Sequence, residues 1–280
     1  MADKQIYRFP NEIDTVEITS MGAKIIVRPH DEDGIYVEYD NPRDTPEFCA
    51  VLNGKTLALK EMLSFSIIGN KPSEDYTIAV FLPAVRYNKI KINTTSGGAD
   101  VENVSAESFE LNTASGEINI NSYFDDIKVT SASGSITLAN PTDNTAKSLS
   151  TRAVSGSASI NGYRAEKFSV HSVSGRTCYN GACGAGEISV TSGTVDVNYA
   201  EWAGDLNISA ISGSVNVTLP ADSGLDISFS GISGMLRTDI GNAKGSFMNL
   251  GKGTSGEFGG ENKHKLNISL TSGAVTVAQQ

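Results

Sequence analysis

From Thr95 to the end of the chain, runs of alternating apolar and polar residues are separated by a recurring Ser-Gly dipeptide. The intervals between successive dipeptides lie between 17 and 22 residues, so the period is about twenty. A repeat of this length is typical of proteins built from stacked structural units. The dipeptides begin at Ser96, Ser115, Ser133, Ser155, Ser174, Ser192, Ser212, Ser233, Ser255 and Ser272.

The apolar positions change parity across the dipeptides. Around Ser212 they are even-numbered before it and odd-numbered after it, at Leu206, Ile208, Ala210, Val215, Val217 and Leu219. A strand that keeps its inward face while its parity changes must contain a bend or bulge at that point. We expect the glycine to supply a positive φ in this bend, and the serine to hydrogen-bond exposed backbone.

These patterns predict an all-β protein, specifically a β-solenoid that resembles a single-stranded β-helix with rungs of about twenty residues. The repetitive part extends over residues 90–280. Its glycine-rich stretch 241–265, with a weak rung around Ser255, is expected to be an extruded loop or a distorted rung. A β-sandwich with regular turns is the alternative.

The first 89 residues have a different composition and are predicted to be a β-rich segment that caps the solenoid within one continuous body. Residues 1–90 contain six of the eight prolines but only four of the 28 glycines. Strand-like alternation covers 15–29, 34–39, 48–60 and 76–82. Asp33-Gly34 and Asn53-Gly54 are typical hairpin turns.

Charge and hydropathy narrow the possible partners. The net charge of -10 and pI near 4.8 disfavour binding to nucleic acid. No apolar run is long enough for a transmembrane helix. The first ten residues lack the apolar core of a signal peptide, which predicts a cytoplasmic chain, or a cell-surface one if the sequence is a processed fragment.

Three repeats and the opening strands carry a family resemblance. Residues 111–120 (L-N-T-A-S-G-E-I-N-I), 129–138 (V-T-S-A-S-G-S-I-T-L) and 208–217 (I-S-A-I-S-G-S-V-N-V) resemble the bacterial putative-adhesin family, as does G-A-K-I-I-V-R-P at 22–29. The resemblance covers nearly the whole chain. It implies a β-solenoid domain of unknown function with an adhesin role, and it brings no catalytic residues.

The sequence indicates no catalytic residue, cofactor or metal site. Acidic residues follow the Ser-Gly steps at different offsets, as at Asp100, Glu117 and Asp196, so no carboxylate pair recurs. The three cysteines do not suggest a disulfide framework. Cys178 and Cys183 are interpreted as separate thiols, with a local disulfide or half of a metal site as the alternative.

Four aromatic residues form a candidate ligand surface: Tyr123, Tyr163, Tyr199 and Trp202. The three tyrosines follow their Ser-Gly serines by seven or eight residues, which places them at or near the same corner. Aligned, exposed rings can stack on sugars or anchor a protein. The competing interpretation is that the rings cap the interior.

The function predicted from these observations is a non-enzymatic adhesin or scaffold that presents a repetitive β surface to protein or glycan partners. A carbohydrate-active β-helix enzyme and an intracellular self-assembling scaffold are the alternatives.

Overall fold

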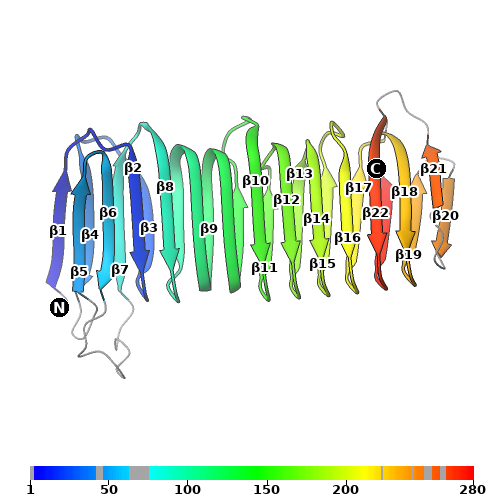
Figure 1. The fold of residues 1–280 in the computed structure, drawn as a ribbon. Coiled ribbons are helices and arrows are strands. Elements are labelled where there is room, and N and C mark those ends of the chain that lie inside the picture. The colour runs from blue at the N-terminus through cyan, green and yellow to red at the C-terminus, as the bar shows by residue number, and fades with distance from the viewer. Residues whose placement is uncertain are drawn as a thin grey trace, which may run out of the picture. The chain divides into compact units, whose positions relative to one another are not determined.

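The computed structural model describes residues 3–41, 47–62, 76–221, 223–240, 243–248, 254–258 and 263–280, and this part of the chain consists of strands and turns without a helix. None of its elements is therefore a helix long and apolar enough to cross a membrane. The chain divides into two compact units, Met1–Ser135 and Ile136–Gln280. Figure 1 shows strands lying side by side within each unit. The predicted all-β solenoid is confirmed.

In the first unit, a rung made of β2 and β3 lies between two other rungs. β2 pairs in parallel with β6 and β8, and β3 pairs in parallel with β7 and β9. Three antiparallel strands complete the unit, because β5 pairs with β6, β4 with β7, and β1 with β4. The strands are β1 (Asp3–Phe9), β2 (Thr15–Ser20), β3 (Lys24–His30), β4 (Ile35–Asn41), β5 (Glu47–Asn53), β6 (Thr56–Met62), β7 (Thr77–Pro83), β8 (Arg86–Thr94) and β9 (Ala99–Ala139).

The second unit stacks its rungs in parallel and in register. From β10 to β15, each strand pairs with the strand two places later in the chain. Its strands are β10 (Ala146–Ala153), β11 (Ser157–Asn161), β12 (Ala165–Ser172), β13 (Arg176–Ala182), β14 (Ala185–Val190), β15 (Thr194–Tyr199), β16 (Leu206–Ala210), β17 (Ser214–Leu219), β18 (Gly224–Gly231), β19 (Met235–Ile240), β20 (Ala243–Met248), β21 (Thr254–Phe258), β22 (Lys263–Leu270) and β23 (Ala274–Gln279).

The rungs do not all stack in chain order. β22 pairs with β16 on one side and with β18 on the other, and β23 pairs in the same way with β17 and β19. The rung that contains Ser272 therefore lies between the rungs of Ser212 and Ser233. The N-terminal rung of β2 and β3 is likewise inserted between rungs that come later in the chain.

The stretch 241–265 is not a regular rung, and it is more than a loop because it contains two antiparallel strands. β20 pairs antiparallel with β19, and β21 pairs antiparallel with β18. Ser255 consequently lies opposite Ser228 in an antiparallel pair, which explains why the repeat is weak there. Residues 241–242, 249–253 and 259–262 of this stretch lie outside the described residues.

The change of parity is confirmed by burial at the Ser-Gly steps whose flanking strands the structure describes. Leu206, Ile208, Val215 and Val217 are all buried, although the first pair is even-numbered and the second is odd-numbered. In-register stacking places Leu266 between Leu206 and Ile227, so the interior consists of columns of aliphatic side chains. The N-terminal strands predicted from alternation also lie where the sequence predicts them, and Gly54 closes the predicted hairpin between β5 and β6. The predicted hairpin at Asp33-Gly34 is wrong, because the strands that this turn joins, β3 and β4, pair with opposite sides of β7 and not with each other. The domain boundary at residue 89 stays a prediction.

Candidate functional site

The serine of each Ser-Gly step stabilises the stacking of rungs. The amide nitrogen of Ser192 donates to the carbonyl of Val173 at 2.8 Å, and the Ser192 hydroxyl donates to the same oxygen at 3.0 Å. Ser212 bonds Thr191 in the same way, at 2.8 and 3.1 Å. The predicted role of serine in bonding the turn backbone is confirmed, and these hydroxyls are already occupied as donors.

At most of the described steps, the glycine has a different role from the one predicted. Among the described Ser-Gly steps, only Gly116 has a positive φ, of 134°. A Cβ atom on Gly175 would overlap the carbonyl oxygen of Gly156, and one on Gly193 would overlap that of Gly175. Close approach of stacked backbones therefore requires the glycine, and the recurring dipeptide is a structural feature rather than a binding motif.

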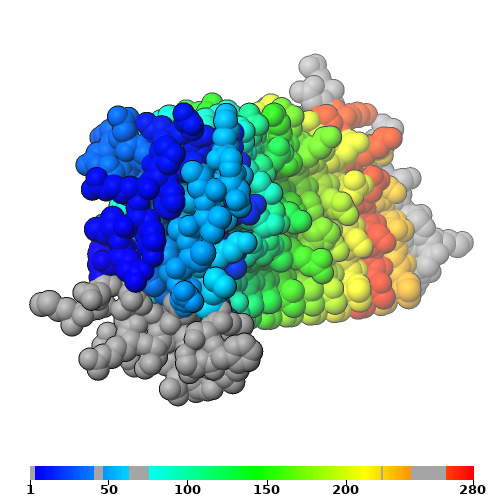
Figure 2. Space-filling view, turned by 60° about the vertical axis from the view of Figure 1, so that its left-hand side comes forward, coloured from blue at the N-terminus to red at the C-terminus, as the bar shows by residue number. Residues whose placement is uncertain are grey.

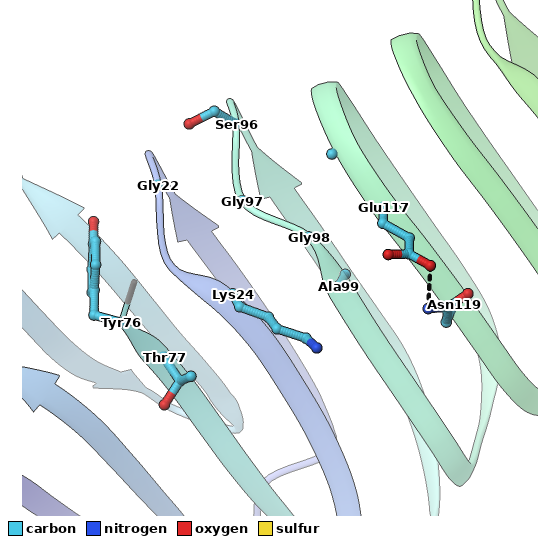
Figure 3. A pocket seen from close by; sticks show the side chains of 11 residues that line it. Gly22, Lys24, Tyr76, Thr77, Ser96, Gly97, Gly98, Ala99, Glu117 and Asn119 are labelled. Atoms are coloured by element: carbon cyan, nitrogen blue, oxygen red, sulfur yellow. Dashed lines mark hydrogen bonds between the residues drawn. The ribbon is translucent and has the colours of Figure 1, made fainter. Parts of the chain in front are cut away.

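A shallow depression of about 330 Å³ lies beside this corner in the first unit. Figure 3 shows its centre, where the backbone of Gly97 and Gly98 passes between Lys24 on β3 and the pair Glu117 and Asn119 on β9. The Asn119 amide donates to the Glu117 carboxylate at 3.3 Å. The lining contains one carboxylate, so it does not supply the pair of acids that glycoside hydrolysis uses.

A second depression, of about 260 Å³, lies on a polar face of the second unit. The face is formed by β14, β16, β22 and β18, which lie in that order. When the four strands are compared in register, one outward-facing position is serine in every strand. The outward-facing position two residues earlier is an amide or a hydroxyl in three of the four strands. We call this surface the serine–asparagine face, and it consists of Glu187, Ser189, Asn207, Ser209, Asn267, Ser269, Ser228 and Ser230.

Hydrogen-bonding groups dominate this face, and it carries one carboxylate. The Asn267 amide donates to the Asn207 amide oxygen at 2.9 Å, so neighbouring rungs are held in register by their side chains. Each of these amides keeps further donor or acceptor capacity, as do the exposed serine hydroxyls. Such a surface can exchange hydrogen bonds with a neutral polar ligand, whereas one carboxylate, Glu187, does not supply paired acid–base catalysis.

The predicted aromatic residues do not form an aligned exposed surface. Tyr163, Tyr199 and Trp202 are 0%, 7% and 6% exposed, respectively. The Tyr163 carbonyl accepts a bond from the Tyr179 hydroxyl at 2.6 Å, and the Trp202 indole donates to the Gly224 carbonyl at 3.1 Å. Burial also raises the pKa of Tyr199.

These three rings therefore belong to the interior, in agreement with the capping interpretation. Burial removes the ring faces on which a sugar would stack. Tyr123, in the first unit, is half-buried.

Cys178 and Cys183 are free thiols. The buried Cys183 thiol lies 3.2 Å from the Ala165 carbonyl. Within the described ranges, no three His, Cys, Asp or Glu side chains gather in a way that would hold a metal ion.

The sequence analysis did not predict the serine–asparagine face, although a repeated tripeptide in the sequence indicates it. The tripeptide Asn-Ile-Ser occurs at 207–209 and again at 267–269. Sixty residues separate the two copies, so their adjacency depends on the insertion of β22 beside β16.

The stacked parallel rungs and their polar outward faces define the class of the protein as a β-solenoid repeat protein. The Toastrack DUF4097 family model matches residues 13–278, and the chain belongs to this family.

Solved structures with a similar fold come from several bacteria. A putative adhesin from Bacteroides fragilis is 12% identical, with 100% of this chain and 97% of that chain covered, at a TM-score of 0.45. A putative adhesin from Parabacteroides distasonis is 13% identical, with 100% and 98% covered, at a TM-score of 0.46. A putative lipid binding protein from the same species is 14% identical, with 98% and 96% covered, at a TM-score of 0.44.

At these identities and TM-scores, the likeness says nothing about what this chain binds. Comparison with curated proteins gives no match.

Proposed function

We propose that the chain is a non-enzymatic adhesion or scaffold protein whose serine–asparagine face binds an extended, uncharged glycan. The observation that supports this most is the register of the face. Ser209, Ser269 and Ser230 occupy equivalent positions on three adjacent strands. Adjacent strands are about 4.8 Å apart, so the hydroxyls recur at a regular, short spacing.

A polysaccharide matches this arrangement chemically. An extended glycan repeats its hydroxyl groups along the chain, and each hydroxyl both donates and accepts hydrogen bonds, as serine and asparagine side chains do. A ligand lying across the strands would meet an equivalent set of groups on each rung. Many weak, repeated contacts give useful affinity through multivalency rather than through one deep pocket.

The lack of a carboxylate pair in the two depressions described above favours binding over hydrolysis at these sites. Glycosidases generally place two carboxyl groups on either side of the bond that they cleave. The depression beside Lys24 and the depression on the serine–asparagine face are each lined by a single carboxylate, Glu117 and Glu187 respectively.

A glycan array probed with the folded chain, followed by titration of the best neutral polysaccharide, tests the proposal. Substitution S209R places a bulky cation at the centre of the face, and we expect it to weaken binding at least tenfold. The matched control is S214R, because Ser214 is also an exposed serine but lies on β17, outside the face.

Both positions are exposed, so circular dichroism should show the same fold for the two variants. An array without a neutral polysaccharide ligand would contradict the proposal. So would equal loss of binding in S209R and S214R.

A further inference from the structure

The inserted rung of β2 and β3 brings together residues that are far apart in the sequence. Figure 2 shows this on one side of the first unit, where N-terminal residues (dark blue) lie beside later residues (light blue), in agreement with the pairing of β2 with β6. On the other strand of this rung, Lys24 pairs with Thr77 of β7, and the next residue, Ile25, pairs with Ala99 of β9. Lys24 therefore lies between Thr77 and Gly98.

Gly98 leaves a gap in a row of outward-facing side chains. It is the second residue after the serine of its Ser-Gly step, and the same position of the next step is Glu117. A Cβ atom on Gly98 would lie only 2.7 Å from the carbonyl oxygen of Glu117, so the close approach of the two rungs requires glycine here. The missing side chain opens the depression of about 330 Å³ between Lys24 and Glu117.

Two charges of opposite sign line this depression. Figure 3 shows the Lys24 ammonium and the Glu117 carboxylate on opposite sides of the Gly97–Gly98 backbone. Among the described residues, neither group forms an ion pair within 4.0 Å. The strands that carry them are two rung spacings of about 4.8 Å apart. The Asn119 amide donates to the Glu117 carboxylate at 3.3 Å and so helps to orient it.

The other carboxylates near the depression are already engaged within the protein. Asp40 accepts bonds from an amide and a hydroxyl of β7, and Asp100 pairs with Arg28 at 2.9 Å. One oxygen of the buried Glu61 carboxylate accepts a bond from the Met21 amide at 2.6 Å, and Glu61 does not line the depression. The ammonium and the carboxylate that do line it are therefore the two charges left for a ligand.

A ligand that fits this site carries both charges. A simple anion is attracted by Lys24 but repelled by Glu117, and the reverse holds for a simple cation. A molecule with an ammonium group and a carboxylate on neighbouring atoms can place each group against its opposite, with charge-assisted hydrogen bonds to both. The hydroxyls of Ser96 and Thr77 already donate to oxygens of the protein. Charge rather than neutral hydrogen bonding therefore selects the ligand.

We propose that the depression between Lys24 and Glu117 binds a small zwitterion of the α-amino acid class. The carboxylate of the ligand lies against Lys24, and its ammonium group lies against Glu117. Lys24 and Glu117 are exposed, so water weakens both contacts, and we expect binding in the millimolar range. This site belongs to the first unit, whereas the proposed glycan face belongs to the second.

The test is a titration of the full, isotope-labelled chain, followed by NMR of the backbone amides of Gly97 and Gly98. The first probe is L-alanine. The second is N-acetyl-L-alanine, which lacks the ammonium group, and the third is L-alaninamide, which lacks the carboxylate. Comparison of the three probes on the unchanged chain needs no variant, so it stays informative even if a substitution disturbs the fold.

The protein variants are K24M and E117Q, which each remove one of the two charges. Their matched controls are K128M and E107Q, because Lys128 and Glu107 are also exposed residues of the first unit but lie outside the depression. A further variant, K24E/E117K, exchanges the two charges. Circular dichroism checks that each variant keeps the fold.

We expect L-alanine to shift the two glycine amides saturably, and each derivative to bind at least tenfold more weakly. K24M and E117Q should each weaken binding of L-alanine at least tenfold, whereas the controls should leave it within twofold. K24E/E117K should bind within threefold of the unchanged chain, because the ligand can lie the other way round. No saturable shift, equal affinity for the three probes, equal effects of the controls, or loss of binding in K24E/E117K would overturn the proposal.

Discussion

At the scale of single residues, close packing of the backbone explains why glycine and serine recur. The carbonyl of one rung occupies the space that a Cβ would fill on the glycine of the next, as at Gly175 and Gly193. The adjacent serine donates twice to one carbonyl of the neighbouring rung. The two residues of the dipeptide thus contribute unequally to stability. A clash between stacked backbones forces the structure to shift, whereas water can replace a hydrogen bond lost at the surface.

Substituting Gly175 by alanine should therefore destabilise the fold by about 1–3 kcal/mol, since the methyl group must displace stacked backbone. Replacing its neighbour Ser174 by alanine removes a hydrogen bond of 3.2 Å at an exposed site. That change should cost at most about 1 kcal/mol. Urea unfolding of G175A and S174A measures both effects, and a smaller effect for G175A than for S174A would refute this account.

Buried tyrosines should make the stability of the fold depend on pH in the alkaline range. Burial raises the pKa of Tyr87 to about 12, against roughly 10 in an unfolded chain. Between these values the unfolded chain loses a proton that the folded chain keeps, so stability falls as pH rises. The contribution is complete below pH of about 10 and is lost as pH approaches about 12.

Urea unfolding between pH 9 and 11 should show this decline, and Y87F should make it less steep. Tyr76 and Tyr179 also have raised pKa values because of burial, so part of the decline should remain. Ionisation of every tyrosine near pH 10 in the folded chain, seen by ultraviolet absorbance, would argue against this explanation.

At the scale of elements, the inserted rung of β22 and β23 contributes more to the stability of the second unit than its place at the C-terminus suggests. It pairs in parallel on both sides, with Leu206 and Ile227 on either side of Leu266. Removing it separates β16 from β18 and β17 from β19 by a full rung. A peripheral strand such as β1 pairs on one side only within the described residues.

Truncation after residue 262 should therefore abolish cooperative unfolding of the second unit, whereas removal of residues 1–9 should lower stability modestly. A synthetic peptide of residues 263–280 added in trans should restore part of the lost stability, because it binds the folded form. Thermal unfolding followed by circular dichroism compares the full chain with both truncated chains and with the C-terminal truncation plus peptide. Equal melting of the truncated and full chains would contradict a central role for this rung.

At the scale of the whole molecule, each unit ends its parallel stack with antiparallel strands. In the first unit these are β5, β4 and β1, and in the second they are β20 and β21. Antiparallel strands at the end of a stack interrupt the parallel register that a further rung would need. Together with the net charge of -10, this arrangement opposes uncontrolled stacking of copies.

Periodicity in the sequence was sufficient for the fold class, the rung length, the bend at each Ser-Gly step and most N-terminal strands. These features depend on local alternation and on turn residues such as Gly54, which act within a few positions. Tertiary structure alone decided the insertion of β2–β3 and β22–β23, because identical alternation fits any neighbouring rung. It also decided that Tyr163 and Trp202 are interior, and that Asn207 meets Asn267 across sixty residues, because burial and adjacency depend on which rungs stack together.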